Sequence, residues 1–139
     1  LFEFGSNTNT LTAAAIYQLQ DAKRLNINDT IYKYLEVLPN IPYGITIKQL
    51  LNHTNGLYNF TSSDEYFDIF LADASKVINP DTVLSFVQKP ISEVGKKFEY
   101  CNTGYTLLGK IIEKIEVTNI RSHLALTIEF TIFGQPGFK

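Results

Sequence analysis

The sequence reads FGSNTNTLTA at residues 4–13, which places a serine, Ser6, directly before a segment with helical periodicity. Small and apolar residues then recur at spacings of three and four, which predicts an amphipathic helix over about residues 10–24. These residues are Leu11, Ala14, Ala15, Leu19 and Ala22. The first N–H groups of a helix and its positive dipole end favour negative charge. Ser6 therefore suits either a helix cap, the usual role of serine there, or a nucleophile whose reaction develops an oxyanion.

The length and composition indicate a single globular domain over residues 1–139. With 45% hydrophobic residues, a chain of this size can bury a core. The net charge of −2 gives no basic surface, so we expect no nucleic-acid partner. No apolar run approaches the roughly 18–20 residues that a membrane-spanning helix needs. The single cysteine allows no internal disulfide, and no cysteine–histidine set has metal-ligand spacing, so we expect no metal and no cofactor.

Start and stop signals along the chain predict further helices, so a mainly α structure is expected. Thr46 and Gln49 have the spacing of a capping box, and Gly56 is expected to end the helix that they begin. Asp29 and Thr103 are expected to act as N-caps of a short helix and of the last long helix. The tail stays open, because apolar residues over 120–133 alternate as in a strand and also recur every four residues as in a helix.

Two further segments contain residue types that can take part in catalysis: LLNHTNGL at residues 50–57 and FEYCNTGY at residues 98–105. Taken alone, Tyr100 would be a half-buried aromatic residue and Asn102 a turn residue. His53 is a candidate catalytic histidine, but a structural role in a helix-ending turn fits it better. Cys101 fits a small buried residue better than a catalytic thiol, since no histidine is near it in the sequence.

In this order, the three segments resemble the penicillin-recognising serine hydrolases, which include class C-type β-lactamases, D-alanyl-D-alanine carboxypeptidases and related esterases. The resemblance covers residues 2–115 clearly and continues weakly to residue 138. It implies the helical part of an α/β fold, with most of the antiparallel sheet supplied by segments outside this chain, which would then be a single partial domain. It also favours a helix over a strand for residues 120–133.

The resemblance assigns roles to four positions. Ser6 corresponds to the nucleophile that forms an acyl-enzyme. Tyr100 corresponds to the tyrosine that moves protons to and from the nucleophile and the leaving group, and Asn102 to the asparagine that contacts the substrate amide. Asn9 stands where the family has the lysine of its Ser-x-x-Lys motif, one helical turn after the serine. In this family the stretch that contains His53 is structural.

Two departures from the family pattern bear on activity. An amide has no useful basicity near neutral pH, so Asn9 cannot deprotonate Ser6. Lys23 lies several turns along the helix and Lys97 is expected to face solvent, so neither is a good replacement for the missing base. The family's Lys/His-x-Gly strand has no counterpart in the sequence. We therefore expect acylation of Ser6 to be close to absent.

Three hypotheses about function follow. The first is a serine hydrolase that cleaves β-lactam, D-Ala-D-Ala peptide or ester bonds through Ser6. The second, which we favour for this chain, is a non-catalytic relative that binds a β-lactam, a peptidoglycan-like peptide or ester, or a partner. The third is a helical interaction domain whose motifs are coincidental. Without its sheet, a helical subdomain would expose the face that the sheet covers, so we expect association through that surface with a partner or a second copy, an altered packing of the tail, or marginal stability. An extracytoplasmic location is implied by the resemblance alone.

Overall fold

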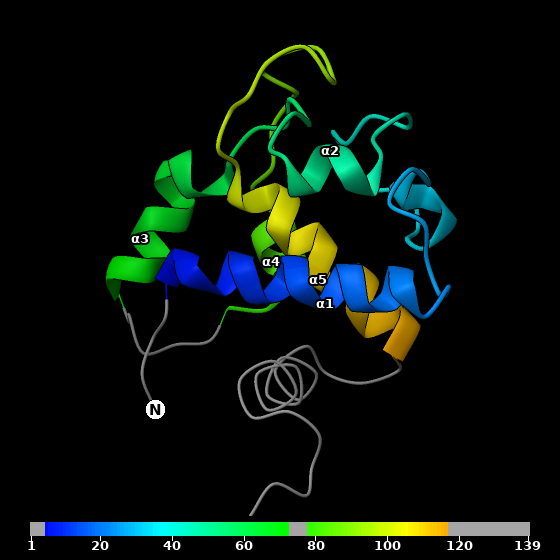
Figure 1. Cartoon of the computed structure of the whole chain (residues 1–139). Coiled ribbons are helices and arrows are strands. Elements are labelled where there is room, and N and C mark those ends of the chain that lie inside the picture. Colours follow the sequence, from blue (N-terminus) through cyan, green and yellow to red (C-terminus); the bar gives the residue numbers. More distant parts are fainter. Residues whose placement is uncertain (1–4, 73–77, 117–139) are drawn as a thin grey trace, which may run out of the picture.

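The computed structural model describes residues 5–72 and 78–116, and these form a mainly helical structure (Figure 1). Within these two ranges no strand forms, and one isolated antiparallel bridge joins Thr30 to Thr46. This confirms the predicted fold class, whereas the predicted helix at residues 120–133 lies outside the described residues. The elements in chain order are η1 (Gly5–Asn7), α1 (Thr8–Asp21), η2 (Ile31–Lys33), α2 (Ile47–Leu51), η3 (Phe60–Ser62), α3 (Asp64–Ala72), α4 (Pro80–Ser85) and α5 (Asn102–Glu116).

The core forms where α1 packs against α5, and α2 and α4 also contact α5. In Figure 1 the blue α1 lies across the yellow and orange α5. Both helices bury one apolar face, and fully burying each leucine or isoleucine is worth about 1.5–3 kcal/mol. The buried residues are Thr12, Ala15, Ile16 and Leu19 on α1, and Thr103, Gly104, Leu107, Leu108, Ile111 and Ile112 on α5. The predicted first helix is therefore present, with its apolar face in the core.

The first helix begins and ends slightly earlier than its periodicity predicts. Lys23 adopts a left-handed backbone with φ 59°, and the Arg24 N–H donates to the Leu19 carbonyl at 2.9 Å. This bond closes the helix in the manner of a Schellman motif. The Arg24 guanidinium then donates to the Ile115 carbonyl at 2.6 Å and pairs with Glu116, which ties the end of α1 to the end of α5.

The start of α2 is as predicted, but its end is not. The Gln49 N–H donates to the Thr46 hydroxyl and the Gln49 side chain accepts from the Thr46 N–H, which is the predicted capping box. The helix ends at Leu51, and His53 takes the left-handed conformation with φ 57°. Gly56, expected to end this helix, lies further on with φ 67°, where a Cβ would stand 2.4 Å from the Ser92 carbonyl oxygen.

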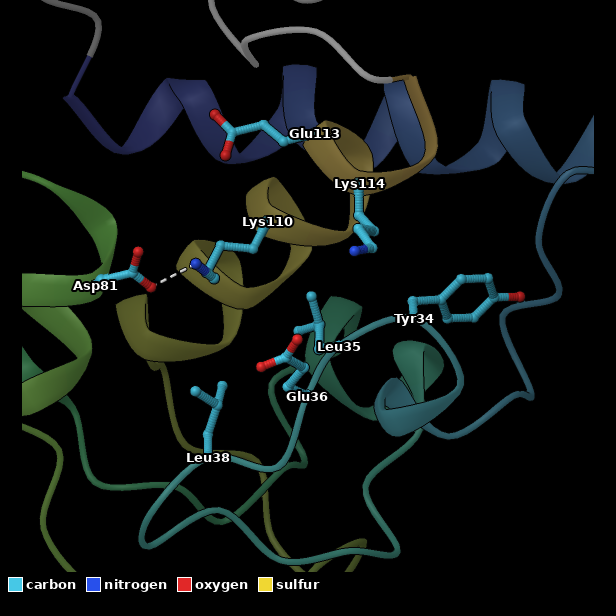
Figure 2. A pocket seen from close by; sticks show the side chains of 8 residues that line it. All are labelled: Tyr34, Leu35, Glu36, Leu38, Asp81, Lys110, Glu113 and Lys114. Atoms are coloured by element: carbon cyan, nitrogen blue, oxygen red, sulfur yellow. Dashed lines mark hydrogen bonds and ion pairs between the residues drawn. The ribbon is translucent and has the colours of Figure 1, made fainter.

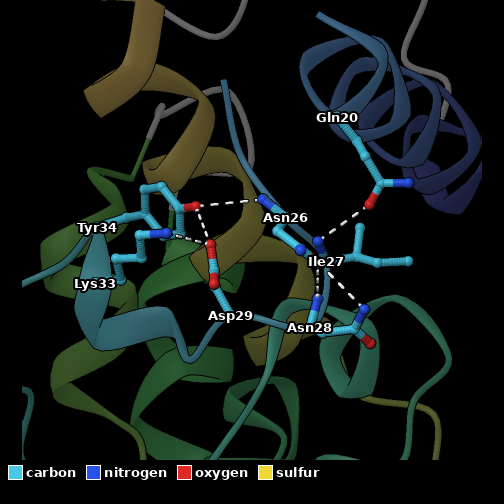
Figure 3. Close-up of polar contacts among 7 residues, drawn as sticks. All are labelled: Gln20, Asn26, Ile27, Asn28, Asp29, Lys33 and Tyr34. Atoms are coloured by element: carbon cyan, nitrogen blue, oxygen red, sulfur yellow. Dashed lines mark hydrogen bonds and ion pairs between the residues drawn. The ribbon is translucent and has the colours of Figure 1, made fainter. Parts of the chain in front are cut away.

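Two predicted caps are wrong. Asp29 does not cap η2; its carboxylate accepts from Lys33 Nζ at 2.7 Å and from the Tyr34 hydroxyl at 2.6 Å (Figure 3). These bonds lower the pKa of the Asp29 carboxyl, the bond from Lys33 contributing most. Thr103 is the second residue of α5 and is fully buried. Its hydroxyl satisfies two groups of the preceding loop instead, because it donates to the Tyr58 carbonyl at 2.7 Å and accepts from the Phe60 N–H at 3.1 Å.

Candidate active site

Ser6 and Asn9 occupy the first turns of the α1 region. Ser6 lies in η1, immediately before α1, and its side chain is exposed. Asn9 is the second residue of α1 and is half-buried. The start of a helix presents N–H groups that lack partners within the helix, so the surroundings of Ser6 favour an oxyanion.

The Asn9 side chain makes the contact that joins α1 to the segment before α5. Its Nδ2 donates to the Tyr100 hydroxyl oxygen at 2.9 Å, across 91 positions of sequence. This direct contact to Tyr100 comes from Asn9, the residue at the lysine position. The resemblance also implies that the Ser6 hydroxyl and the Tyr100 phenol face one another across a shared cleft, which stays a prediction. Ser6 lies three residues before Asn9, in the 3-10 turn η1 that leads into α1.

A cleft of about 540 Å³ brings together three of the four predicted site positions, Ser6, Asn9 and Asn102. It lies between the start of α1 and the exposed side of α5, where Tyr105 and Lys110 also line it. This volume is within the usual range for small-molecule sites, about 300–1,000 Å³. Tyr100 reaches this group through its bond with Asn9. The geometry thus groups the four positions, while their catalytic roles stay a prediction.

Asn102 is held at the start of α5 by bonds to the loop around η3. Its N–H donates to the Asn59 side-chain oxygen at 3.1 Å, and its Nδ2 donates to the Thr61 hydroxyl at 3.3 Å. Because these bonds fix both the backbone and the amide, Asn102 has a defined orientation at the rim of the cleft. The Asn102 carbonyl accepts from the Thr106 hydroxyl at 3.2 Å.

Neither lysine considered from the sequence can replace the missing base. Lys23 follows α1, and the 14 residues of that helix span about 21 Å, which separates it from Ser6. Lys97 is exposed and pairs with the Glu99 carboxylate at 2.7 Å. This pairing, followed by the bond from the Ser92 hydroxyl, lowers the pKa of the Glu99 carboxyl. Neither Lys23 nor Lys97 lines the cleft that contains Ser6.

Lys110 lines the cleft, and our reading of the sequence missed it. It lies eight residues after Asn102 on α5, so the two are about 12 Å apart along the helix axis. Figure 2 shows its ammonium group directed at the Asp81 carboxylate, with which it forms an ion pair at 2.5 Å. Helical spacing from Asn102 could have revealed Lys110 on this face. Its pairing with Asp81 makes it a poor general base for Ser6.

His53 and Cys101 take the structural roles that fitted them best. The Cys101 thiol is buried, which raises its pKa, and lies 3.6 Å from the Leu57 carbonyl oxygen. His53 Nδ1 accepts from the Cys101 N–H at 3.2 Å, and burial lowers the pKa of the imidazole. A neutral histidine that is already engaged by a backbone N–H serves the loop rather than a substrate.

The described parts of the chain contain no group of three His, Cys, Asp or Glu residues placed to hold a metal ion. Over the same residues, no helix has the length and apolar character needed to cross a membrane.

The described residues form the helical part of a β-lactamase/transpeptidase-like fold. The chain belongs to the Beta-lactamase family, whose model matches residues 1–125.

Individual relatives agree with this assignment. The chain is 37% identical over 121 residues to Penicillin-binding protein 4* of Bacillus subtilis, covering 82% of this chain and 25% of that protein. It is 31% identical over 151 aligned positions to Protein flp of Staphylococcus aureus strain MW2, covering 99% of this chain and 29% of that protein. The chain thus spans a quarter to less than a third of the length of these relatives.

Solved structures show the same likeness. A D-stereospecific amidohydrolase from a Streptomyces species superposes with a TM-score of 0.83 at 28% identity, over 92% of this chain and 41% of that one. The octameric penicillin-binding protein homologue from Pyrococcus abyssi superposes with a TM-score of 0.70 at 29% identity, over 90% of this chain and 30% of that one.

Proposed function

We propose that this chain forms the serine side of a penicillin-recognising hydrolase site that binds its ligand but acylates Ser6 extremely slowly. The observation that carries the proposal is the 2.9 Å hydrogen bond from Asn9 Nδ2 to the Tyr100 hydroxyl oxygen. The family has a lysine at this position. In this chain the neutral amide of Asn9 takes its place and contacts the Tyr100 phenol.

The chemical consequence follows from what an amide lacks. An amide cannot accept the Ser6 proton at neutral pH, and it places no positive charge beside the phenol oxygen to stabilise a phenolate. A positioned general base is typically worth about 10²–10⁴ in rate, and losing one member of a coupled nucleophilic unit can cost more. The serine would therefore keep its place at the helix start without the means to lose its proton.

The ligand class follows from the resemblance and from the groups around the cleft. We propose a β-lactam, a D-Ala-D-Ala-like peptide or an ester, each of which presents a carbonyl oxygen. Side chains able to hydrogen-bond such a ligand lie at both walls of the cleft, with Ser6 on one side and Asn102 on the other. The family resemblance also supports an extracytoplasmic location, which fractionation of the native host would test.

Intact-mass spectrometry after incubation with a reactive penicillin tests the proposal. The unmodified chain is expected to show no adduct, whereas Asn9→Lys is expected to raise the rate of Ser6 acylation at least about 10²-fold. Thr10→Lys is a matched control, because Thr10 is exposed and lies next to the cleft residues without lining it. A rapid penicillin adduct on Ser6 of the unmodified chain would show that inactivity is wrong. Failure of Asn9→Lys to gain any acylation would show that the missing base is not what limits the reaction.

A second candidate, partner binding, is favoured by α3. No residue of this helix is fully buried, although Tyr66 packs against Phe60 of the core. Three of its large apolar residues are exposed: Phe67, Phe70 and Leu71. We propose that this exposed apolar surface supports self-association. Sedimentation velocity over a range of concentrations is expected to show dimers that Leu71→Lys abolishes. A monomer at all concentrations would contradict this candidate.

A further inference from the structure

His53 accepts hydrogen bonds from the backbone N–H groups of the two residues next to Tyr100 in the sequence. Its carbonyl accepts from the Glu99 N–H at 2.8 Å, and its Nδ1 accepts from the Cys101 N–H at 3.2 Å. The two donors are the residues immediately before and after Tyr100. One side chain and its own backbone therefore fix the short segment that carries the phenol.

The imidazole ring also packs against the Tyr100 ring. Their centroids lie 4.7 Å apart with 39° between the ring planes. Tyr105 of α5 lies at 5.0 Å and Phe98 at 5.7 Å from the same imidazole. The Tyr105 hydroxyl in turn donates to the Leu51 carbonyl at 3.0 Å, at the end of α2. The imidazole thus lies between α5 and the segment of residues 98–101.

We propose that His53 is a positioning residue, which holds the Tyr100 phenol within hydrogen-bonding distance of the Asn9 side chain. The inference deepens the proposed function and rests on it, because it treats Tyr100 as part of the Ser6 site. His53 acts through the backbone of residues 99–101 and through ring contact, and it requires no contact with a ligand.

The hydrogen bond from the Cys101 N–H to His53 Nδ1 depends on the charge of the imidazole. Nδ1 accepts a hydrogen bond only when it carries no proton. In a doubly protonated ring the Nδ1–H would face the Cys101 N–H, and two donors cannot form a hydrogen bond with each other. No carboxylate takes part in the contacts of this ring in the described structure. The Glu99 carboxylate is bound by Lys97 and by the Ser92 hydroxyl, and the Cys101 thiol lies against the Leu57 carbonyl. Burial raises the pKa of the Tyr105 phenol in contact with the ring, so this phenol is uncharged at neutral pH.

Burial adds to this dependence, because it lowers the pKa of His53 and keeps the ring neutral near pH 7. The folded state thus binds a proton at His53 less readily than the unfolded chain does. The hydrogen bond from His53 that positions the Tyr100 segment is present at neutral pH and is lost as the pH falls through the lowered pKa of His53.

The left-handed backbone at His53 decides which variant is informative. An alanine there would add backbone strain to the loss of the ring, whereas glycine adopts φ 57° without strain. His53→Gly therefore removes Nδ1 and the ring while leaving the carbonyl that accepts from Glu99. Phe98→Leu is the matched control, because it removes another ring contact with His53 and leaves both hydrogen bonds in place.

Nuclear magnetic resonance of the ¹⁵N-labelled chain between about pH 5 and 8 tests the proposal. The Asn9 side-chain amide signal is expected to shift with the same midpoint as the His53 ring. In His53→Gly that dependence is expected to vanish, and hydrogen exchange at the Cys101 amide is expected to rise about fivefold, the factor for one ordinary hydrogen bond. Phe98→Leu is expected to keep both properties. An Asn9 signal that ignores the His53 titration in the unmodified chain would overturn the proposal, whether or not His53→Gly folds.

A second readout separates this inference from the proposed function. In the Asn9→Lys chain, adding His53→Gly is expected to lower the penicillin acylation rate about fivefold without a matching change in ligand affinity. If Asn9→Lys never acylates but the Asn9 amide of the unmodified chain follows His53, the proposed function fails and the positioning role stands. If Asn9→Lys acylates equally well with and without His53, the positioning role fails and the proposed function stands.

Discussion

The substitution Gly56→Ala would test how closely the loop after α2 approaches the segment that leads to Tyr100. Gly56 has φ 67°, and an added Cβ would stand 2.4 Å from the Ser92 carbonyl oxygen. The Gly56 carbonyl also accepts from the Ile91 N–H at 2.9 Å, so the two segments cannot separate freely. The left-handed backbone costs about 1–2 kcal/mol for alanine, and displacing Ser92 costs about 1–3 kcal/mol more. We therefore expect Gly56→Ala to lower the free energy of unfolding by about 2–5 kcal/mol.

Urea denaturation followed by circular dichroism measures this change. Gly109→Ala is the matched control, since Gly109 lies within α5 and an added Cβ meets no heavy atom within 4 Å. Alanine favours a helix over glycine, so this control is expected to gain about 0.5–1 kcal/mol. A loss below about 2 kcal/mol for Gly56→Ala would refute the close approach, because the left-handed backbone alone can account for a loss of that size.

Three further predictions concern hydrogen bonds made by single side chains. Thr46→Ala removes the capping box of α2 and is expected to lower the free energy of unfolding by about 1 kcal/mol in urea denaturation. The bonds from Lys33 and Tyr34 lower the pKa of Asp29, so the stability that its carboxylate contributes is present above the unfolded value of 3.8 and is lost as the pH falls through the folded value. Asp29→Asn is therefore expected to lose less stability than the unmodified chain as the pH falls below 3.8. Urea midpoints that fall equally with pH in both chains would contradict this. Thr103→Val leaves the buried Phe60 N–H without its hydrogen-bond partner and removes the hydroxyl that donates to the Tyr58 carbonyl, so it is expected to lower the free energy of unfolding by about 1–3 kcal/mol. A change below about 0.5 kcal/mol would show that the hydroxyl is not needed.

Features that depend on neighbouring residues could be predicted from the sequence. The capping box of Thr46 and Gln49 joins residues three apart, and the apolar face of α1 follows from helical periodicity. Asn79 likewise caps α4, accepting from the Asp81 N–H as a helix start should. Such bonds form within one turn, so the residue types and their spacing are enough to indicate them.

Features that depend on distant segments were predicted poorly. Gly56 looked like a helix end, but its freedom is needed where Ser92 comes close, and His53 ends the turn of α2 instead. Thr103 looked like a cap, yet its hydroxyl serves a loop more than forty residues earlier. The contact between Asn9 and Tyr100 spans 91 positions, and only the family resemblance pointed to it. Periodicity and spacing contain no information on such pairs, because the fold alone brings them together.

The packing of α1 against α5 also has a consequence for synthesis on the ribosome. The apolar face of α1 ends near Leu19, while the helix that covers it is complete only at Glu116. At about 5–20 residues per second, the emerging chain would leave that face without its partner for roughly 5–20 s. During this interval the apolar face of α1 is exposed to solvent and can aggregate. Binding by a chaperone early in translation would therefore favour the yield of folded protein.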